Sequence, residues 1–263
     1  MKRIFSPNGL IYLWVSIAFS WAYNKISSRP DSASAPNKVF AFAAFKIPKP
    51  QQQSIRTLCG DIKRQNTQKD NHKDFWNQYN VTYAQHAEAV DIFMSIPEIR
   101  QIIEESLSAN WTSKEFNVVL SEPSGPSLFT KSQKWHFDLS NPNNVKIFFS
   151  DENVCANNGA TEFIPHFFDS FLSKSQVPPF PSGSENVGDA LSSTRRTINV
   201  DLTKCWGINT ASLLHRGARH TTGRRFLCIL EFSSDSYHSD LRRYGLGREK
   251  GINSETIFKK TSP

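Results

Sequence analysis

Apolar residues recur along this chain with two different periods, and the change falls near residue 111. Between residues 75 and 107 they return every three to four positions, which is the period of an amphipathic helix. The pattern predicts two helices, whose buried faces are Tyr83, Ala87, Val90, Phe93 and Met94, then Ile96, Ile99, Ile102, Ile103 and Leu107. Ser95 followed by Glu98 is typical of a capping box, so we expect it to open the second helix.

Beyond Trp111 the period falls to two, as in strands that have one buried face. Strands are predicted over residues 116–120, 135–139, 145–149, 161–164, 197–202, 211–215 and 226–232. Many short strands separated by turn residues are typical of a sandwich or a barrel. We therefore expect a mainly β fold, a double-stranded β-helix (jelly roll), with bracing α-helices from the N-terminal half.

The segments at the two ends differ in composition from this central part. We expect a hydrophobic N-terminal segment and linker over 1–38, the jelly-roll domain with its helical N-terminal part over 39–246, and a polar tail over 247–263. Residues 39–45 form a possible first strand of the domain. Residues 46–72 are polar and predict irregular structure or a surface helix.

The N-terminal apolar run has two interpretations. Lys2 and Arg3 precede an apolar stretch over 10–23, a pattern that fits a secretory signal or a membrane anchor. It fits a buried helix, or a hydrophobic strand and turn, equally well. Membrane association through residues 10–23 therefore stays open. The location is cytoplasmic, or membrane-associated or exported if this segment is a signal or anchor.

The charge and cysteine content restrict the partners. A net charge of +7 and a pI of about 9.2 favour acidic partners: nucleic acid, anionic lipid, or a substrate that bears phosphate or carboxylate. No recognised nucleic-acid motif accompanies the scattered basic residues, so we expect no nucleic acid partner. Cys59, Cys155, Cys205 and Cys228 lie far apart without a Cys-x-x-Cys pattern, which argues against a zinc or redox site. Cys228 lies in an apolar strand, where we expect a small core residue.

His136 and Asp138 are the strongest candidates for chemistry. In a strand, residues i and i+2 point to the same face, so both side chains can reach one metal ion. His215 ends the apolar run Ala211-Ser212-Leu213-Leu214, which predicts a strand-end residue supplied by a second strand. Two histidines and one carboxylate form the ligand set of a non-haem iron site. The simpler interpretation of the pair is a surface histidine beside a strand-end aspartate.

Arg225 opens the last predicted strand and would share one face with Leu227 and Ile229. A guanidinium held there can bind a carboxylate through two parallel hydrogen bonds. Arg224 faces the other way and is the competing candidate. A solvated arginine at the start of a strand is the simpler interpretation.

Together these segments resemble the Fe(II)/2-oxoglutarate-dependent dioxygenases, and within them the phytanoyl-CoA dioxygenase-like family. The resemblance is carried by Trp135-His136-Phe137-Asp138, Gly159-Ala160-Thr161-Glu162-Phe163-Ile164-Pro165, His215-Arg216-Gly217-Ala218 and Arg225. It covers residues 116–232 well and 75–115 loosely. The chain departs from the family where His166-Phe167-Phe168 follows Pro165, and where the interval from histidine to arginine is one residue short. The second departure keeps the choice between Arg225 and Arg224 open.

The resemblance implies that His136, Asp138 and His215 hold Fe(II), and that Arg225 and Thr222 bind the far carboxylate of the co-substrate 2-oxoglutarate. It implies oxidation of a small-molecule metabolite or lipid-like substrate by molecular oxygen, with release of succinate and CO2. The carboxylate Asp138 favours hydroxylation, because halogenating relatives carry a small residue at that place. The alternative is a non-catalytic, cupin-like module that binds a metal or ligand.

Overall fold

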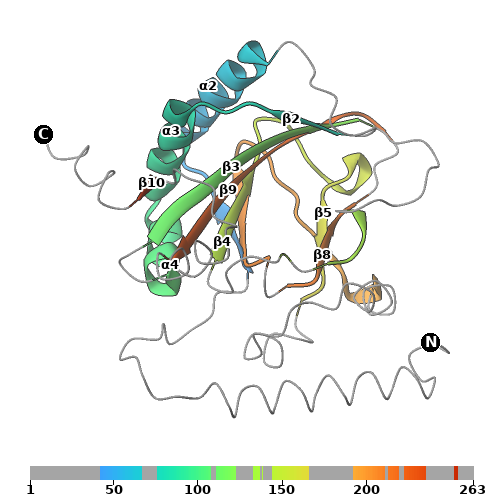
Figure 1. Cartoon of the computed structure of the whole chain (residues 1–263). Helices are drawn as coiled ribbons and strands as arrows, with labels where there is room; N and C mark the ends of the chain where they lie inside the picture. Colours follow the sequence, from blue (N-terminus) through green and yellow to red (C-terminus); the bar gives the residue numbers. More distant parts are fainter. Residues whose placement is uncertain are drawn as a thin grey trace, which may run out of the picture.

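Two antiparallel β-sheets and a layer of helices make up the described part of the chain (Figure 1). The computed structural model describes residues 42–66, 76–107, 111–122, 133–136, 138, 144–165, 192–210, 213–218, 222–234 and 252–253. The mainly β fold with bracing helices that the sequence predicts is confirmed. The predicted domain boundaries at residues 38 and 246 lie outside these residues.

The large sheet is built around β9, which pairs with β4 on one side and with β3 on the other. Its strands lie in the order β1-β7-β4-β9-β3-β10. β10 pairs with β3 at residues 112–113, and β2 pairs with β3 at residues 118–121. The bounds are β1 Phe42–Lys46, β2 Trp76–Tyr79, β3 Trp111–Ser121, β4 Asn144–Phe149, β7 Lys204–Ile208, β9 Arg225–Ser234 and β10 Ile252–Asn253. β3 pairs with β9 along its whole length, with one irregularity between Ser113 and Glu115. Three of the predicted strand segments, 116–120, 145–149 and 226–232, lie within this sheet, in β3, β4 and β9.

A small sheet faces the large one and carries part of the candidate site. It has the order β6-β5-β8, with β5 Thr161–Phe163, β6 Arg196–Thr197 and β8 His215–Gly217. Two short 3-10 helices, η2 Ala156–Asn158 and η3 Ser192–Thr194, precede β5 and β6. Glu162 of β5 links its two neighbours, because its carboxylate accepts from Arg195, just before β6, at 2.9 Å and from Arg216 of β8 at 2.9 Å.

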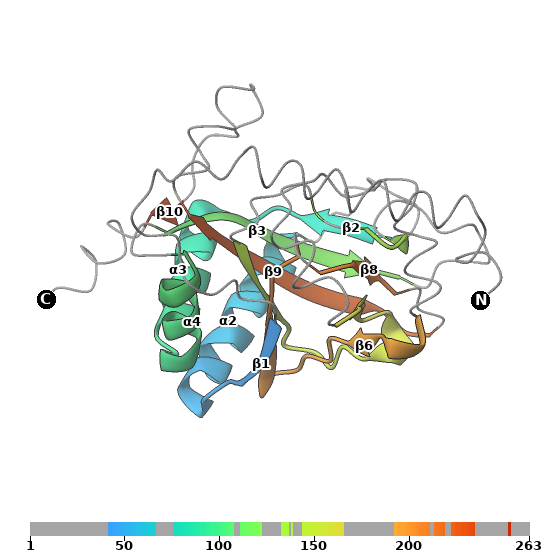
Figure 2. The ribbon, with the colours of Figure 1, turned by 90° about the horizontal axis from the view of Figure 1, so that it is seen from below.

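Three helices cover the opposite face of the large sheet: α2 Lys49–Gln65, α3 Tyr83–Met94 and α4 Pro97–Leu107. Both views show the helices on one side of β3 and β9 and the small sheet on the other (Figures 1 and 2). Even-numbered β9 residues, including Phe226, Leu230 and Phe232, pack in the core beneath the helices. Leu227 and Ile229 instead belong to the core between the two sheets, with Phe148 and Phe163.

Local capping differs from the sequence prediction. The Thr82 hydroxyl accepts from the Gln85 main-chain N–H at 3.2 Å, and the Gln85 side-chain oxygen accepts from the Thr82 N–H at 2.9 Å. This reciprocal pair is a capping box, and it begins α3. The predicted box at Ser95 and Glu98 is wrong, because Ser95 closes α3 and its hydroxyl donates to the Ile92 carbonyl at 2.7 Å. The second helix begins only at Pro97.

Two further predictions are settled by the described residues. The first strand, β1, lies where 39–45 suggested, at Phe42–Lys46. Residues 46–72 include a 17-residue helix whose face of Ile55, Leu58, Cys59 and Ile62 is buried, so this helix belongs to the core layer. Most of the polar residues that made this segment read as a surface element lie on the outer face of the helix.

No helix among the described residues is long and apolar enough to cross a membrane. The apolar run over 10–23, for which a signal or an anchor was one expectation, lies outside the described residues.

Candidate metal centre

The main chain brings His136 and His215 side by side. The two residues form an antiparallel bridge, in which the N–H of each donates to the carbonyl of the other at 2.9 and 3.0 Å. Two residues further on, the Asp138 N–H donates to the Thr210 carbonyl at 3.0 Å. This second hydrogen bond holds the main chain of Asp138 beside the segment that leads to His215. His215 is the first residue of β8 and not the last residue of a strand, as the sequence suggested. The pairing still brings together three side chains that lie up to 79 positions apart in the sequence.

The donor atoms of His136, Asp138 and His215 converge. They all lie within 4.8 Å of one another. Asp138 Oδ1 is 3.7 Å from His136 Nε2 and 3.6 Å from His215 Nε2. Neighbouring ligands of an octahedral ion at about 2.1 Å from each donor are about 3 Å apart. Asp138 Oδ1 therefore needs to approach each imidazole by less than about 1 Å, and the two imidazoles need to approach each other by less than about 2 Å. The three side chains could therefore hold one metal ion.

Both imidazoles are oriented by the main chain in the way that metal ligands require. His136 Nδ1 lies 2.7 Å from the Lys134 carbonyl oxygen, and His215 Nδ1 lies 3.0 Å from the Leu213 carbonyl oxygen. A carbonyl oxygen only accepts, so each Nδ1 carries the hydrogen and each Nε2 presents its lone pair. Such contacts to the second ring nitrogen fix the tautomer and the ring plane of histidine ligands.

The electrostatics keep Asp138 and His215 in their ligating forms. Burial alone would raise the pKa of Asp138, but His215 and Lys146 outweigh it and hold the pKa well below its ordinary value. Burial lowers the pKa of His215 to about 4, although Asp138 opposes this shift. At neutral pH the carboxylate is therefore charged and His215 is neutral. The side chains of His136 and Asp138 are 31% and 25% exposed, so the centre opens to one side.

Arg225 lies at the start of β9 on the face that looks toward the small sheet, as the sequence predicted. Its guanidinium donates to the Gly159 carbonyl and, at 3.0 Å, to the Ser121 hydroxyl of β3. Its Nε is buried and has no hydrogen-bond partner among the described residues. Burial lowers the pKa of Arg225 to about 10, so the group is still charged at neutral pH.

Within the described residues, no carboxylate forms an ion pair with Arg225, and its two contacts are to neutral oxygens. A charged guanidinium enclosed without an anion is costly unless a ligand supplies the missing charge. The chemistry of the group and its unpaired Nε fit the carboxylate that the sequence resemblance assigned to this residue.

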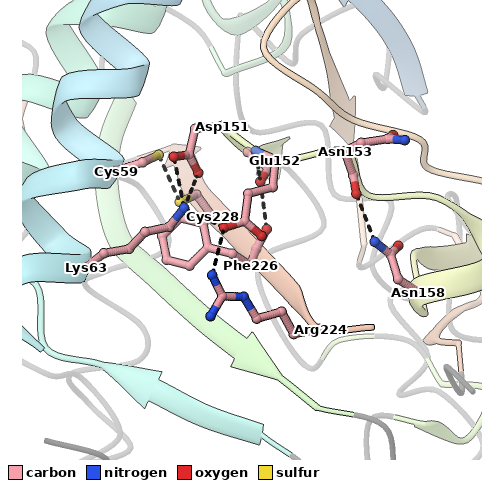
Figure 3. Close-up of polar contacts among 10 residues, drawn as sticks. Cys59, Lys63, Asp151, Glu152, Asn153, Asn158, Arg224, Phe226 and Cys228 are labelled. Carbon is pink, nitrogen blue, oxygen red and sulfur yellow. Dashed lines mark hydrogen bonds and ion pairs between the residues drawn. The ribbon is translucent and has the colours of Figure 1, made fainter. Parts of the chain in front are cut away.

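Arg224, the competing candidate, points away from this interior. It is exposed, and its guanidinium lies 3.8 Å from Glu152, a residue that Lys63 also binds, at 2.7 Å (Figure 3). Thr222 is exposed too, and its hydroxyl donates to the Asn157 carbonyl at 3.3 Å. Thr222 and Arg225 therefore contact the same short segment, 157–159, just before β5.

Sequence reasoning missed two charged residues beside the centre. Lys146 of β4 donates to Asp138 Oδ2 at 2.6 Å and lies 3.3 Å from Glu231 Oε2 on β9. A signal was present in the sequence, because each is a charged residue inside an otherwise apolar strand. Ser121, which binds Arg225, carries no such signal.

Comparisons with known proteins support the fold. No family model matches the chain, and no curated protein sequence matches it. Among solved structures, the chain is similar to the epimerase SnoN in complex with Fe3+, alpha ketoglutarate and nogalamycin RO. That match has 13% identity, covers 84% of each chain and has a TM-score of 0.51. At this identity the similarity establishes a shared fold.

Two further structures are similar over a smaller part of the chain. HygX from Streptomyces hygroscopicus, with nickel, 2-oxoglutarate and hygromycin B bound, shares 13% identity over 74% of this chain and 83% of its own, with a TM-score of 0.48. The non-heme monooxygenase ThoJ, as its nickel complex, shares 12% identity over 74% of both chains, with a TM-score of 0.45.

Proposed function

We propose that the protein is an Fe(II)- and 2-oxoglutarate-dependent oxygenase that hydroxylates a small-molecule metabolite or lipid-like substrate. The observation that carries the proposal is the pairing of two features in one interior. His136, Asp138 and His215 present three converging donors, and Arg225 presents a charged guanidinium without an acidic partner in the described residues. The motif resemblance to the phytanoyl-CoA dioxygenase-like family supports the same assignment.

When bound, iron and 2-oxoglutarate supply the oxidising chemistry, in which oxygen-dependent decarboxylation to succinate and CO2 drives oxidation of the substrate. His136, Asp138 and His215 would hold the ion through three donors and leave its other positions to exogenous ligands. Arg225 binds the far carboxylate of 2-oxoglutarate and so fixes its orientation. Thr222 is a second candidate contact for that carboxylate.

The residues around the centre also determine its environment. Leu227 and Ile229 follow Arg225 along the same face of β9 and pack with Phe148 and Phe163, which keeps this side of the interior apolar. An apolar wall excludes water and strengthens the contact between the guanidinium and a carboxylate. The partly exposed side of His136 and Asp138 is where a substrate would enter.

The test is calorimetric titration of Ni(II)-loaded protein with 2-oxoglutarate, because Ni(II) replaces iron without turnover. Arg225→Met should weaken binding by about 100-fold, since charge-assisted paired hydrogen bonds are worth about 3 kcal/mol. Arg224→Met is the matched control and should leave the affinity within about twofold. Equal losses in both variants would contradict the assignment of Arg225.

The same titration separates the proposal from a cupin-like binding module. Such a module would bind Ni(II) through the three donors but show no saturable heat with 2-oxoglutarate. That result, from protein that still binds the metal, would reject the oxygenase.

A further inference from the structure

Two charged residues lie directly opposite each other in the middle of the large sheet. Lys146 of β4 pairs in register with Glu231 of β9. The residues on either side of Lys146, Val145 and Ile147, point to the helical layer and are fully buried there. Lys146 and Glu231 instead face the interior between the sheets, where Asp138 lies.

The two carboxylate oxygens of Asp138 have different neighbours. Oδ1 faces both imidazoles, 3.7 Å from His136 Nε2 and 3.6 Å from His215 Nε2. Oδ2 accepts from the Lys146 ammonium at 2.6 Å. The ammonium is in turn 3.3 Å from Glu231 Oε2, and the side chains of Lys146 and Glu231 are only 16% and 8% exposed.

We infer that Lys146 is a positioning residue: it holds Oδ2 of Asp138 so that the carboxylate ligates the metal through Oδ1 alone, and Glu231 holds Lys146 in place. The inference rests on the proposed function, since it concerns the same metal centre. Hydrogen bonds to the unligated oxygen of a carboxylate ligand orient it, and their loss typically weakens metal binding by about 10- to 100-fold.

A purely structural role explains this arrangement poorly. Enclosing ammonium and carboxylate groups costs free energy of solvation, and replacing a buried ion pair by apolar residues of similar size is often neutral or stabilising. The surrounding strands are apolar, so a methionine and a leucine would fit the pattern of both strands. An ion pair kept in such a place is better explained by what it does to Asp138.

The alternative is that Lys146 acts only through its charge. The two possibilities predict opposite changes in metal affinity when the ammonium is removed. A cation beside a divalent metal ion repels it, so removing the ammonium should tighten metal binding if charge alone matters. If orientation of Asp138 dominates, removing the ammonium should weaken metal binding.

The experiment uses Co(II) as the probe and two measurements on the full chain. The double variant Lys146→Met/Glu231→Leu removes the pair together, so no isolated charge is left at these positions. Its thermal midpoint without metal should equal or exceed that of the wild type. Its Co(II) dissociation constant, from calorimetry, should rise about 10- to 100-fold.

Glu231→Gln is the matched control, because it removes a charge but keeps an acceptor oxygen for Lys146, which therefore stays in contact with Asp138. Its Co(II) affinity should stay within about threefold of the wild type. An unchanged or tighter affinity in the double variant would overturn the inference, and so would an equal loss in Glu231→Gln. Wild-type protein that does not bind Co(II) at all would instead reject the metal centre and the proposed function.

Discussion

At the scale of single residues, three histidines show how surroundings decide what an imidazole can do. His136 and His215 each give Nδ1–H to a carbonyl two residues earlier, which leaves Nε2 for a metal. His86 on α3 has the opposite arrangement. Ser113 Oγ donates to the Glu231 carbonyl at 3.0 Å, so it accepts from His86 Nε2–H, 2.8 Å away. His86 therefore has its Nε2 occupied and supports the fold.

His86 should make the stability depend on pH. Burial lowers its pKa to about 4, against an ordinary 6.5, and nearby Glu115 opposes the shift only partly. The unfolded chain therefore binds more protons between these values, and stability is lost as pH falls from about 6.5 to 4. The part due to His86 amounts to about 3 kcal/mol at most.

Urea unfolding at pH 7.0, 5.5 and 4.5 should test this with His86→Gln beside the wild type. The difference between the two free energies should shrink as pH falls, because only the wild type carries this histidine. His215 is present in both proteins, so its own titration cancels. A difference that stays constant with pH would contradict the buried, neutral state of His86.

Among the elements, β3, β4 and β9 of the large sheet were predicted because each has a clear apolar pattern, whereas β2, β7 and β10 of the same sheet were not predicted. Phe226, Cys228, Leu230 and Phe232 alternate with Leu227 and Ile229, and both faces of β9 are covered, one by helices and one by the small sheet. The short strands gave a weaker signal. β8 has three residues, and its existence depends on pairing with β5, which a local pattern does not encode.

Helix boundaries show why a motif alone misleads. Ser95 and Glu98 have the spacing of a capping box, but Pro97 starts the second helix and Ser95 already serves the end of α3. The true box, Thr82 with Gln85, has the same form and was not recognised. Both sites satisfy the pattern, so only the path of the main chain distinguishes them.

Thr82→Ala should lower the free energy of unfolding by about 1 kcal/mol, the usual worth of an N-cap. Thr82→Ser keeps the hydroxyl and should remain within about 0.5 kcal/mol of the wild type. Urea denaturation of the three proteins at pH 7 measures both values. If Ser cost as much as Ala, the contribution would come from the methyl group and not from the cap.

At the scale of the whole molecule, the candidate centre depends on contacts that join distant parts of the chain. The resemblance and the i, i+2 spacing predicted that His136 and Asp138 share one metal, and the bridge between His136 and His215 brings the third candidate donor beside them. The sequence could not show that Arg225 is enclosed by Ser121 and Gly159, which lie 104 and 66 positions away. Nor could it show that Lys146 would reach Asp138, since that contact depends on how the strands pack.

Visible absorption of the protein with Fe(II) and 2-oxoglutarate under anaerobic conditions tests whether one interior holds both the metal and 2-oxoglutarate. We predict a charge-transfer band from the chelate, absent in His215→Ala, weakened in Arg225→Met and unchanged in Arg224→Met. Folded wild-type protein that binds Fe(II) but shows no band at saturating 2-oxoglutarate would contradict the proposed 2-oxoglutarate-dependent function.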